Sequence, residues 1–474
     1  MYRALHLGIG LSLYLAIPAL FGPALAPVGS GLGIMAAIAW LWVSEALHVS
    51  VTALLVPLLA VASGLLVLDQ ALVQFADPII FLFLGGFALA TGLRQQGLDR
   101  WLAGYVIRRS GRRLASAARA LFWLTAVLSM WISNTATAAM MLPLALGLLS
   151  ALPAAGSSTG SAPGADPGLA PEAGPAPSGD GDRRSRIYVL LGIAFAANIG
   201  GIGTLVGSPP NAIAAANAGI GFAEWLLIGL PLVLLMLPLM ELALRIALRP
   251  NLQPAVTFAA DSRPWGRSQW LMLLVFAAAV LGWVFGAPLA GLLETWFGTG
   301  IGRGYDALVA MTALVLLHAL GLARWRTIQR DTDWGVLLLF GGGLTLSRVL
   351  TDSGAGAWLA GQLAGPFAAM PVLWSLLLMA LFAMALTEVA SNTASAALLI
   401  PLFIGLAPTI DGVAIAMLVA IATSCAFLLP VATPPNAIIF GSGQVPQRQM
   451  IHGGLWVTLA ILPLLVGLAL WLGH

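Results

Sequence analysis

The chain consists mainly of long apolar stretches, and this feature limits its possible folds more than any other. The stretches cover residues 8–25, 32–66, 78–93, 116–151, 187–218, 222–248, 269–293, 306–323, 334–350, 357–408, 412–443 and 454–472. A helix that spans a bilayer needs about 20 mostly apolar residues. Several stretches are longer than that, so we expect them to hold two passes or a hairpin. The pattern predicts an all-α polytopic membrane protein.

The shortage of charged residues supports the same interpretation. Only 8% of the 474 residues are charged, whereas soluble domains contain about 25%. Lipid must therefore cover the surface, which excludes a secreted domain, a nucleic-acid-binding protein and an ordinary cytosolic enzyme. The single cysteine, Cys425, excludes an internal disulfide and a cysteine-based metal cluster. The histidines are scattered without the spacing of zinc ligands.

The arginines predict how the chain lies in the membrane. All 21 Lys-or-Arg residues are arginine. If 116–151 and 357–408 are re-entrant hairpins, every arginine except Arg303 and Arg348 lies on the side of the N-terminus. Positive residues gather on the cytoplasmic side. We expect a multi-pass protein of the inner (plasma) membrane, with its N-terminus in the cytoplasm and its C-terminus outside.

Two segments need separate interpretation. The first stretch follows Arg3 and ends near Ala-Leu-Ala at 24–26, so it could be a signal peptide. We expect an uncleaved transmembrane helix within residues 1–31, because the rest of the chain is also membrane-embedded. Residues 152–182 are rich in Pro, Ala, Gly and Ser and contain no aromatic residue. This composition predicts a disordered loop outside the bilayer.

The chain repeats itself. SNTATAAMMLPLALGL, starting at Ser133, matches SNTASAALLIPLFIGL, starting at Ser391, at an offset of 258. GSPPNAI from Gly207 matches ATPPNAI from Ala432 at an offset of 225. The offsets differ by 33, close to the length of the 152–182 loop, which the second half lacks. Two homologous halves, one with a loop insertion, explain both offsets.

The two repeats, residues 32–250 and 251–474, have opposite orientations in the predicted topology. The opening span of the first, at 32–50, runs from outside to inside, and that of the second, at 269–288, runs from inside to outside. Secondary transporters use such inverted repeats to build alternating gates around one site at the midplane. The predicted fold has about 11 transmembrane helices plus two re-entrant hairpins, with broken helices at the midplane.

Each Ser-Asn-Thr motif lies in the middle of an apolar hairpin. The arms around the first motif, about 116–131 and 136–151, span roughly 24 Å each as helices and reach the midplane. A tip there frees backbone N–H and C=O groups that only a ligand or cavity water can satisfy. The N–H groups and the dipole of the second arm suit an anion. The carbonyls, with Ser, Thr and Asn oxygens, suit a hard cation such as sodium.

Glycine and proline predict a broken helix in each repeat, at 187–218 and 412–443. Four glycines and a Pro-Pro pair occur within residues 198–211, and residues 429–436 are their counterpart. Such a composition breaks a helix within the membrane. A single Ser-Asn-Thr is usually a hydrogen-bonding group between helices, and glycine and proline are common in membrane helices. Both motifs occur twice, in register, which favours a ligand site.

These features resemble those of the divalent anion–sodium symporter family of di- and tricarboxylate transporters. The resemblance rests on the paired Ser-Asn-Thr hairpins, the GSPPN and TPPN breaks and the Thr387-Glu388 pair, and it covers about residues 30–472. It implies a homodimer in which each protomer has a scaffold part and a mobile transport part. The scaffold would comprise about 1–115 and 251–350, and the transport part about 116–250 and 351–474.

The resemblance also implies which residues bind the ligands. The first sodium site would be formed by Ser129, Ser133, Asn134 and Gly207. The second would be formed by Thr387, Ala390, Asn392 and Ala432. The dicarboxylate would contact Asn134, Thr135, Ser208, Asn392, Thr393, Thr433 and Pro434. Ser129 and Thr387 each lie one helical turn before the serine of their motif, so the two sets are equivalent.

The implied function is sodium-coupled symport of C4-dicarboxylates, such as succinate, malate or fumarate, by an elevator-type mechanism. No arginine or lysine lies in either motif region, so co-bound sodium would supply the positive charge that a dianion needs. The expected partners are the dicarboxylate, sodium ions and the lipid bilayer. We expect no other cofactor and no nucleic acid.

Several alternatives stay open. A sodium-independent dicarboxylate exchanger, or a sodium-coupled carrier of citrate or sulfate, could use the same scaffold. A membrane enzyme would need a catalytic signature that the sequence lacks, and two occluding hairpins suit alternating access better than a channel. Glu388 is either a functional acid at membrane depth or a hydrogen-bonding group of the hairpin tip. Glu45 and His48 are expected at the membrane interface.

Overall fold

The computed structural model describes residues 2–110, 113–150, 180–254, 266–297, 304–368 and 370–473, and within these ranges every regular element is a helix. The first half forms α1 (Tyr2–Ala19), η1 (Pro23–Leu25), α2 (Ala26–Ser44), α3 (Val49–Ala62), α4 (Leu68–Leu72), η2 (Val73–Ala76), α5 (Pro78–Gln95), α6 (Leu98–Arg109), α7 (Leu114–Ser129), α8 (Asn134–Ser150), α9 (Asp180–Gly201), η3 (Leu205–Gly207), α10 (Pro209–Ala218) and α11 (Phe222–Leu248). The second forms α12 (Arg267–Val284), α13 (Gly286–Phe297), α14 (Tyr305–Ala319), α15 (Trp325–Asp331), α16 (Trp334–Asp352), α17 (Ala355–Ala368), α18 (Val372–Thr387), α19 (Asn392–Leu406), α20 (Gly412–Ser424), α21 (Pro434–Gly441) and α22 (Gln447–Leu472).

Several of these helices suit a membrane. Six helices in the described part of the chain are long and apolar enough to cross a bilayer. The arms of both predicted hairpins, α7 with α8 and α18 with α19, are among the shorter apolar helices. They are short because each arm ends at a tip inside the molecule. The all-α polytopic prediction is confirmed.

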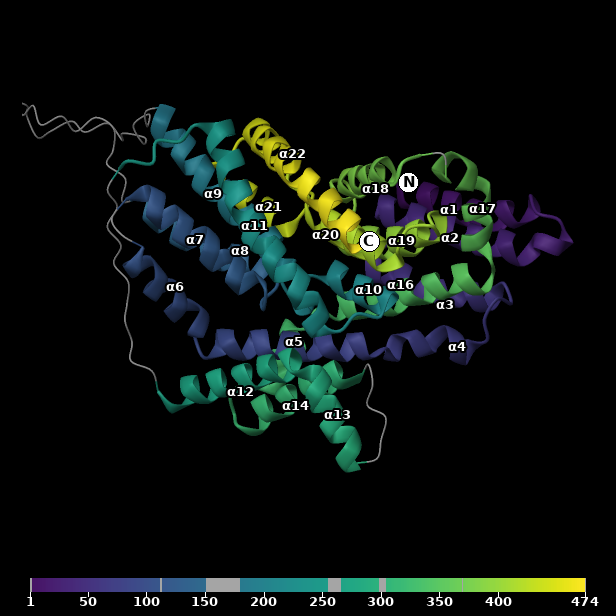
Figure 1. Ribbon diagram of the computed structural model, residues 1–474, viewed down its shortest axis with the longest axis horizontal. Helices are drawn as coiled ribbons and strands as arrows, with labels where there is room; N and C mark the ends of the chain where they lie inside the picture. Colours follow the sequence, from purple (N-terminus) through teal and green to yellow (C-terminus); the bar gives the residue numbers. More distant parts are fainter. Residues whose placement is uncertain are drawn as a thin grey trace, which may run out of the picture.

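The two repeats are interlaced. In Figure 1, α5 of the first repeat packs on α14 of the second, and α16 of the second packs on α3 of the first. Glycine permits both crossings. A Cβ on Gly85 of α5 would lie 2.5 Å from the Ala310 carbonyl oxygen, and one on Gly342 of α16 would lie 2.6 Å from the Ala53 carbonyl oxygen. Small residues allow helix backbones to approach this closely in membranes.

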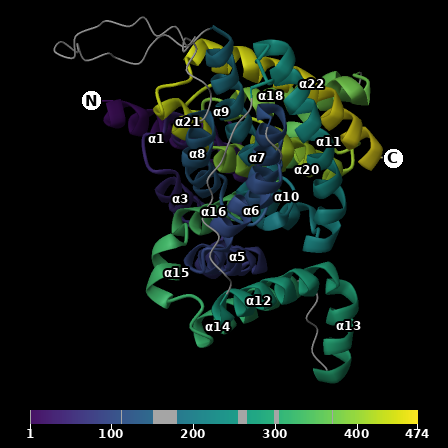
Figure 2. The same cartoon turned by 90° about the vertical axis from the view of Figure 1, so that its left-hand side faces the viewer.

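The hairpins and broken helices are interlaced in the same way. α10 packs on α19 and α20 of the other repeat, and α21 packs on α8 and α9. Each broken helix therefore lies against the hairpin of the opposite repeat. Figure 2 shows this group on one side of α5, with α12, α13 and α14 on the other.

The second hairpin is shorter than predicted. The apolar stretch 357–408 contains three helices, and α17 is separate from the hairpin formed by α18 and α19. Pro371, which precedes α18, has extended backbone angles (φ −54°, ψ 140°), so it begins a new helix instead of continuing α17. The predicted range 357–408 was wrong in this respect.

Two other predicted boundaries change. The stretch 32–66 divides into α2 and α3, because Glu45 has left-handed backbone angles (φ 48°) that end α2. α2 already begins at Ala26, inside the segment assigned to the N-terminal helix. Most of the predicted 152–182 loop lies outside the described residues. Its last residues, 180–182, belong to the first turn of α9.

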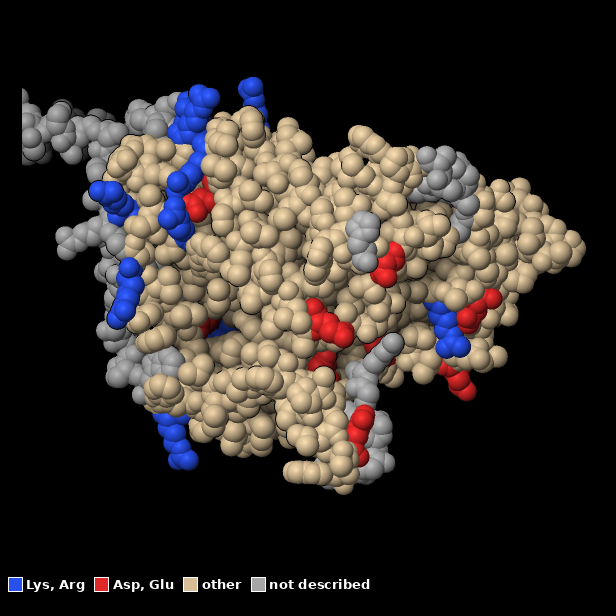
Figure 3. Space-filling view, viewed as in Figure 1, with Lys and Arg blue, Asp and Glu red and all other residues tan. Residues whose placement is uncertain are grey.

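Arginine side chains gather at one end of the molecule. Figure 3 shows them over the region where α7 and α9 begin. Several helices have arginine at or near a terminus: Arg113, Arg183, Arg184, Arg249 and Arg267. This is the side that the sequence predicts to be cytoplasmic. The orientation of the two chain termini stays a prediction.

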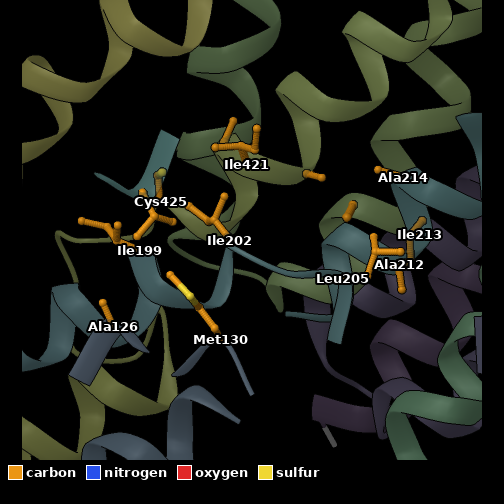
Figure 4. Close-up of a cluster of buried hydrophobic side chains, with 14 of the residues drawn as sticks. Ala126, Met130, Ile199, Ile202, Leu205, Ala212, Ile213, Ala214, Ile421 and Cys425 are labelled. Carbon is orange, nitrogen blue, oxygen red and sulfur yellow. The ribbon is translucent and has the colours of Figure 1, made fainter. Parts of the chain in front are cut away.

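A buried apolar cluster backs the first hairpin tip. Figure 4 shows Met130, just after α7, beside Ile199 and Ile202 near the break of α9, with Cys425 next to them. Met130 is 7% exposed, and the other three are 1% exposed or less. These side chains fill the interior behind the tip and leave the polar groups of the motif facing the other way.

Candidate binding site

Both hairpin tips and both helix breaks line one cavity of about 900 Å³. The predicted residues on its surface are Ser133, Asn134, Thr135, Gly207, Ser208, Ala390, Asn392, Thr393, Ala432, Thr433 and Pro434. The remaining two, Ser129 and Thr387, are fully buried behind the tips. The structure therefore brings the candidate residues of both repeats together.

Four helices of the tips and breaks begin at this cavity: α8, α10, α19 and α21. The first N–H groups of a helix have no partner within it, and the helix dipole adds partial positive charge there. The starts of α8 and α19 provide backbone donors for anionic groups, whereas α10 and α21 begin with Pro-Pro, which has no N–H, and contribute their dipoles.

The first tip is tied to the first broken helix by Asn134. With its amide oriented so that the nitrogen faces acceptors, Asn134 Nδ2 donates to Ser129 Oγ at 2.7 Å. It also lies 3.3 Å from each of the carbonyl oxygens of Ala197 and Gly207. Ser129 Oγ donates to the Ala197 carbonyl at 2.7 Å. The hydroxyl and carbonyl oxygens of the predicted first sodium set therefore lie close to one another.

The second tip repeats this arrangement. Thr387 Oγ1 lies 2.7 Å from Asn392 Oδ1 and 2.8 Å from the Thr423 carbonyl oxygen, and its single proton serves one of them. Thr387 and Asn392 follow Ser129 and Asn134 at the 258-residue offset of the sequence repeat. The same local chemistry is therefore built twice.

The asparagine of each Pro-Pro-Asn sequence holds its break together. Asn211 Nδ2 donates to the carbonyls of Gly201 at 2.8 Å and Thr204 at 2.7 Å. The Gly201 carbonyl belongs to the last residue of α9, and the Thr204 carbonyl lies in the break, where it also accepts from the Gly207 N–H. The side chain therefore satisfies groups at the broken end of α9. Asn436 does the same in the second repeat, with its Nδ2 at 3.1 Å from the Leu429 carbonyl.

Glu388 binds backbone rather than ligand. Its Oε1 accepts from the N–H groups of Phe427 and Leu428, and its Oε2 accepts from that of Leu429, each at 2.9 Å. These three donors belong to the unwound segment after α20. Of the two roles open for Glu388, the contacts support the hydrogen-bonding role at the tip.

The opposite wall of the cavity carries charged residues that were not predicted. Asp331 accepts from Arg94 Nη2 at 3.2 Å and from Arg330 Nε at 2.9 Å. Glu45 and His48, expected at the membrane interface, also line this wall. The two arginines share one carboxylate, so this group of three side chains keeps a net charge of +1.

These wall residues gave no recognisable signal in the sequence. Arg94 and Arg330 lie in different repeats, and only the packing of α15 on α5 brings them to one carboxylate. Asn198 was also overlooked as a site residue. It lines the cavity and is fully buried, and the signal was its polarity within the otherwise apolar run that ends α9.

A second cavity, of about 500 Å³, lies between the start of α11 and the helices α5, α13 and α14. It contains none of the predicted residues. Asp306 Oδ2 accepts from the Phe222 N–H, and Glu224 Oε2 accepts from the Gly221 N–H, both at 2.8 Å. These carboxylates cap α11.

Comparisons with known proteins agree with this architecture. A family model described as citrate transporter matches residues 35–423. An "uncharacterized transporter" of Haemophilus influenzae is 45% identical over 448 residues, which cover 94% of this chain and 92% of the relative. A sodium-dependent dicarboxylate transporter of Staphylococcus saprophyticus is 30% identical over 465 residues, which cover 92% of this chain and 85% of the relative.

A solved structure shows the same fold. The crystal structure of the YdaH transporter of Alcanivorax borkumensis, reported to have an unusual topology, aligns with a TM-score of 0.52 at 17% identity. The alignment covers 85% of this chain and 87% of the other. The family model spans α2 to α20, and the Staphylococcus relative bears out the resemblance to the divalent anion–sodium symporters. The chain therefore belongs to the citrate transporter family and, as its sequence predicts, is a transporter rather than an enzyme.

Proposed function

We propose that the protein is a sodium-coupled symporter of C4-dicarboxylates such as succinate, malate or fumarate. The observation that carries this proposal is the single cavity on which both Ser-Asn-Thr tips and both breaks converge. Helix N-termini and the side chains of Asn134, Thr135, Asn392 and Thr393 offer donors from two opposed repeats. Two opposed sets of donors suit a small molecule with a carboxylate at each end.

Sodium provides the charge that these donors lack. The proposed first site comprises Ser129, Ser133, Asn134 and Gly207, and the second comprises Thr387, Ala390, Asn392 and Ala432. Hydroxyl, amide and carbonyl oxygens are ligands for hard cations. Neither tip carries a basic side chain, so sodium ions beside the tips would offset the charge of a dianion. The name of the Staphylococcus relative supports sodium as the coupling ion.

The proposed movement is an elevator. One wall of the cavity comes from residues within 116–250 and 351–474, and the other from residues within 1–115 and 251–350. A site between these two parts can be exposed alternately to each side if the hairpin part slides along the other part as a rigid body. We propose that the second part is the scaffold and that it dimerises. Light scattering of the purified protein in detergent tests the dimer, and a monomeric mass contradicts it.

Uptake of labelled succinate into proteoliposomes tests the transport activity. An inward sodium gradient should drive accumulation, whereas choline in place of sodium should abolish it. Uptake that is independent of sodium and needs internal succinate would show an exchanger. The family description favours citrate as a second candidate substrate. Uptake of citrate or sulfate without uptake of succinate would reject the C4-dicarboxylate.

Alanine variants of Asn134 and Asn392 test the site. Each change removes a tip amide that holds the oxygens of a proposed sodium site, so we expect sodium-driven uptake to fall roughly a hundredfold or more. Asn251→Ala, in an exposed segment outside the cavity, is the matched control and should leave uptake unchanged. Near-normal uptake by Asn134→Ala or Asn392→Ala would show that the binding residues lie elsewhere.

A further inference from the structure

Asn198 connects the two halves of the cavity. It lies near the end of α9 in the first repeat, is fully buried and lines the cavity. Its Nδ2 donates to the hydroxyl oxygen of Thr433 in the second repeat at 3.1 Å and lies 3.5 Å from the Ala426 carbonyl oxygen. A carbonyl only accepts, so the Ala426 carbonyl requires the amide nitrogen of Asn198, and not its oxygen, on the side that faces Thr433.

The Thr433 hydroxyl is thereby left with one direction for its proton. Thr433 Oγ1 accepts from Asn198 Nδ2 and, at 3.3 Å, from the backbone N–H of Asn436. A hydroxyl has two acceptor positions and one proton to donate. With both acceptor positions used, Thr433 acts towards any further partner only as a donor. The cavity, which Thr433 lines, is where such a partner would lie.

The equivalent hydroxyl of the first repeat behaves differently. Ser208 Oγ lies 3.4 Å from Ser424 Oγ, and Ser424 Oγ donates to the Ala420 carbonyl at 3.0 Å. Since the proton of Ser424 is used within its own helix, the proton between the two serines comes from Ser208. Ser208 therefore presents acceptor positions to the cavity, and Thr433 presents a donor.

The amide oxygen of Asn198 indicates that this arrangement has a function. Asn198 Oδ1 is buried and has no hydrogen-bond partner among the described residues. A buried acceptor without a partner costs free energy. Alanine or serine at this position would avoid that cost, but neither would place an N–H on Thr433 Oγ1.

We propose that Asn198 is a positioning residue for the transported anion: it turns the Thr433 hydroxyl into the cavity as a donor to a substrate carboxylate. The proposal rests on the proposed function, because it needs an anionic substrate in this cavity. It places one carboxylate of the substrate in the second repeat, beside the start of α21. The two otherwise similar halves of the site are then unequal. A carboxylate that accepts from this hydroxyl gains a charge-assisted hydrogen bond.

Five single variants, Ser208→Ala among them, test the proposal in the full-length protein. Thr433→Val removes the hydroxyl with little change of shape, and Thr433→Ser keeps it. Asn198→Ala removes the amide, and Asn198→Asp replaces the donor nitrogen with an oxygen that draws the Thr433 proton away from the cavity. The dissociation constant of succinate is measured from thermal stabilisation in saturating sodium, together with KM and kcat for uptake.

We expect Asn198→Ala and Thr433→Val each to raise the dissociation constant and KM by roughly tenfold or more, with a smaller change in kcat. Asn198→Ala should have no further effect in the Thr433→Val background, but its full effect in the Thr433→Ser background. Asn198→Asp should weaken binding at least as much as Asn198→Ala. Ser208→Ala should weaken succinate binding less than Thr433→Val, because the Ser208 proton is already used.

Three results would overturn the proposal. One is unchanged succinate affinity in both Asn198 variants. Another is an Asn198→Ala effect that persists in full without the Thr433 hydroxyl, since Asn198 would then act independently. The third is a fall in the unfolding temperature of the succinate-free variant that is large enough to explain its whole loss of succinate binding. If the wild type itself binds neither succinate nor citrate, the proposed function fails. If the wild type binds succinate but the variants behave as in one of these three results, only the role of Asn198 fails.

Discussion

Glu388 is the clearest chemical difference between the two hairpin tips. The equivalent residue of the first tip is Met130, whose backbone carbonyl accepts from the Thr204 hydroxyl. One neutral hydrogen bond in the first repeat is thus replaced by a carboxylate with three backbone donors in the second. Glu388 is 8% exposed and Phe427 is buried, while Leu428 and Leu429 are half-buried. The carboxylate therefore sets the shape of the unwound segment that carries the second site.

Replacing Glu388 should destabilise the second break. In Glu388→Ala the N–H groups of Phe427, Leu428 and Leu429 lose their acceptor. The N–H of buried Phe427 is left without a partner, and an unpaired buried donor costs about 1–3 kcal/mol. We expect a lower unfolding temperature and lost uptake. Glu388→Gln, which keeps one carbonyl oxygen, should give an intermediate result.

The control for this change is Glu224→Gln. Glu224 also accepts from a backbone N–H, that of Gly221, but it is exposed. The unfolding temperature of Glu224→Gln should stay close to that of the wild type. Full stability of Glu388→Ala would show that water or another group can replace the carboxylate.

Among the helices, α11 and α22 pack against the breaks of their own repeats through glycine. A Cβ on Gly229 of α11 would lie 2.8 Å from the Ile202 carbonyl oxygen. A Cβ on Gly454 of α22 would lie 2.2 Å from that of Phe427. These separations are shorter than real Cβ contacts, so each helix supports its break at a distance that only glycine allows.

Gly454→Ala should push the second break away from α22. Because the Phe427 carbonyl is part of the backbone, it cannot rotate aside, and we expect a loss of stability of about 1–3 kcal/mol together with reduced uptake. Gly467→Ala on the same helix is the matched control, since its Cβ would have no neighbour within 4 Å. Its stability should be unchanged or slightly higher. Equal effects of the two changes would show that the close contact is unimportant.

In the molecule as a whole, the two tips differ in what covers a residue shortly before each motif. Trp131, at the first tip, packs its ring against Phe276 and Trp283 of α12, with centroids 5.0 and 6.4 Å apart. Val389, at the equivalent position of the second tip, lines the cavity and is 60% exposed. Trp131 is therefore covered by α12, whereas Val389 is uncovered. Ser133 and Thr135 of the first tip are themselves exposed and line the cavity.

Cysteine labelling tests which side of the membrane the second tip faces. The native Cys425 is only 1% exposed, so the wild type should remain unlabelled by a membrane-impermeant maleimide. Val389→Cys should react in inside-out vesicles, because the arginine rule places the Arg94–Asp331 wall on the cytoplasmic side. Succinate with sodium should slow the reaction. Labelling from the outside alone would reverse the predicted orientation.

The helices and the positions of the tips and breaks could be predicted because each depends on neighbouring residues. Apolar stretches define helices, and glycine and proline interrupt them wherever they occur in the chain. The candidate site residues Asn134 and Asn392 were identified from motifs that recur at a fixed offset. Even here Pro371 was overlooked, and the second hairpin was drawn too long.

The remaining features depend on contacts between distant parts of the chain. Asn198 reaches Thr433 and Arg94 reaches Asp331, and both pairings cross from one repeat to the other. Local sequence carries no information about such partners, because they meet only after the repeats interlace. Composition and motif therefore establish a membrane protein with two equivalent half-sites. The hydrogen-bond directions that make the halves unequal follow from packing.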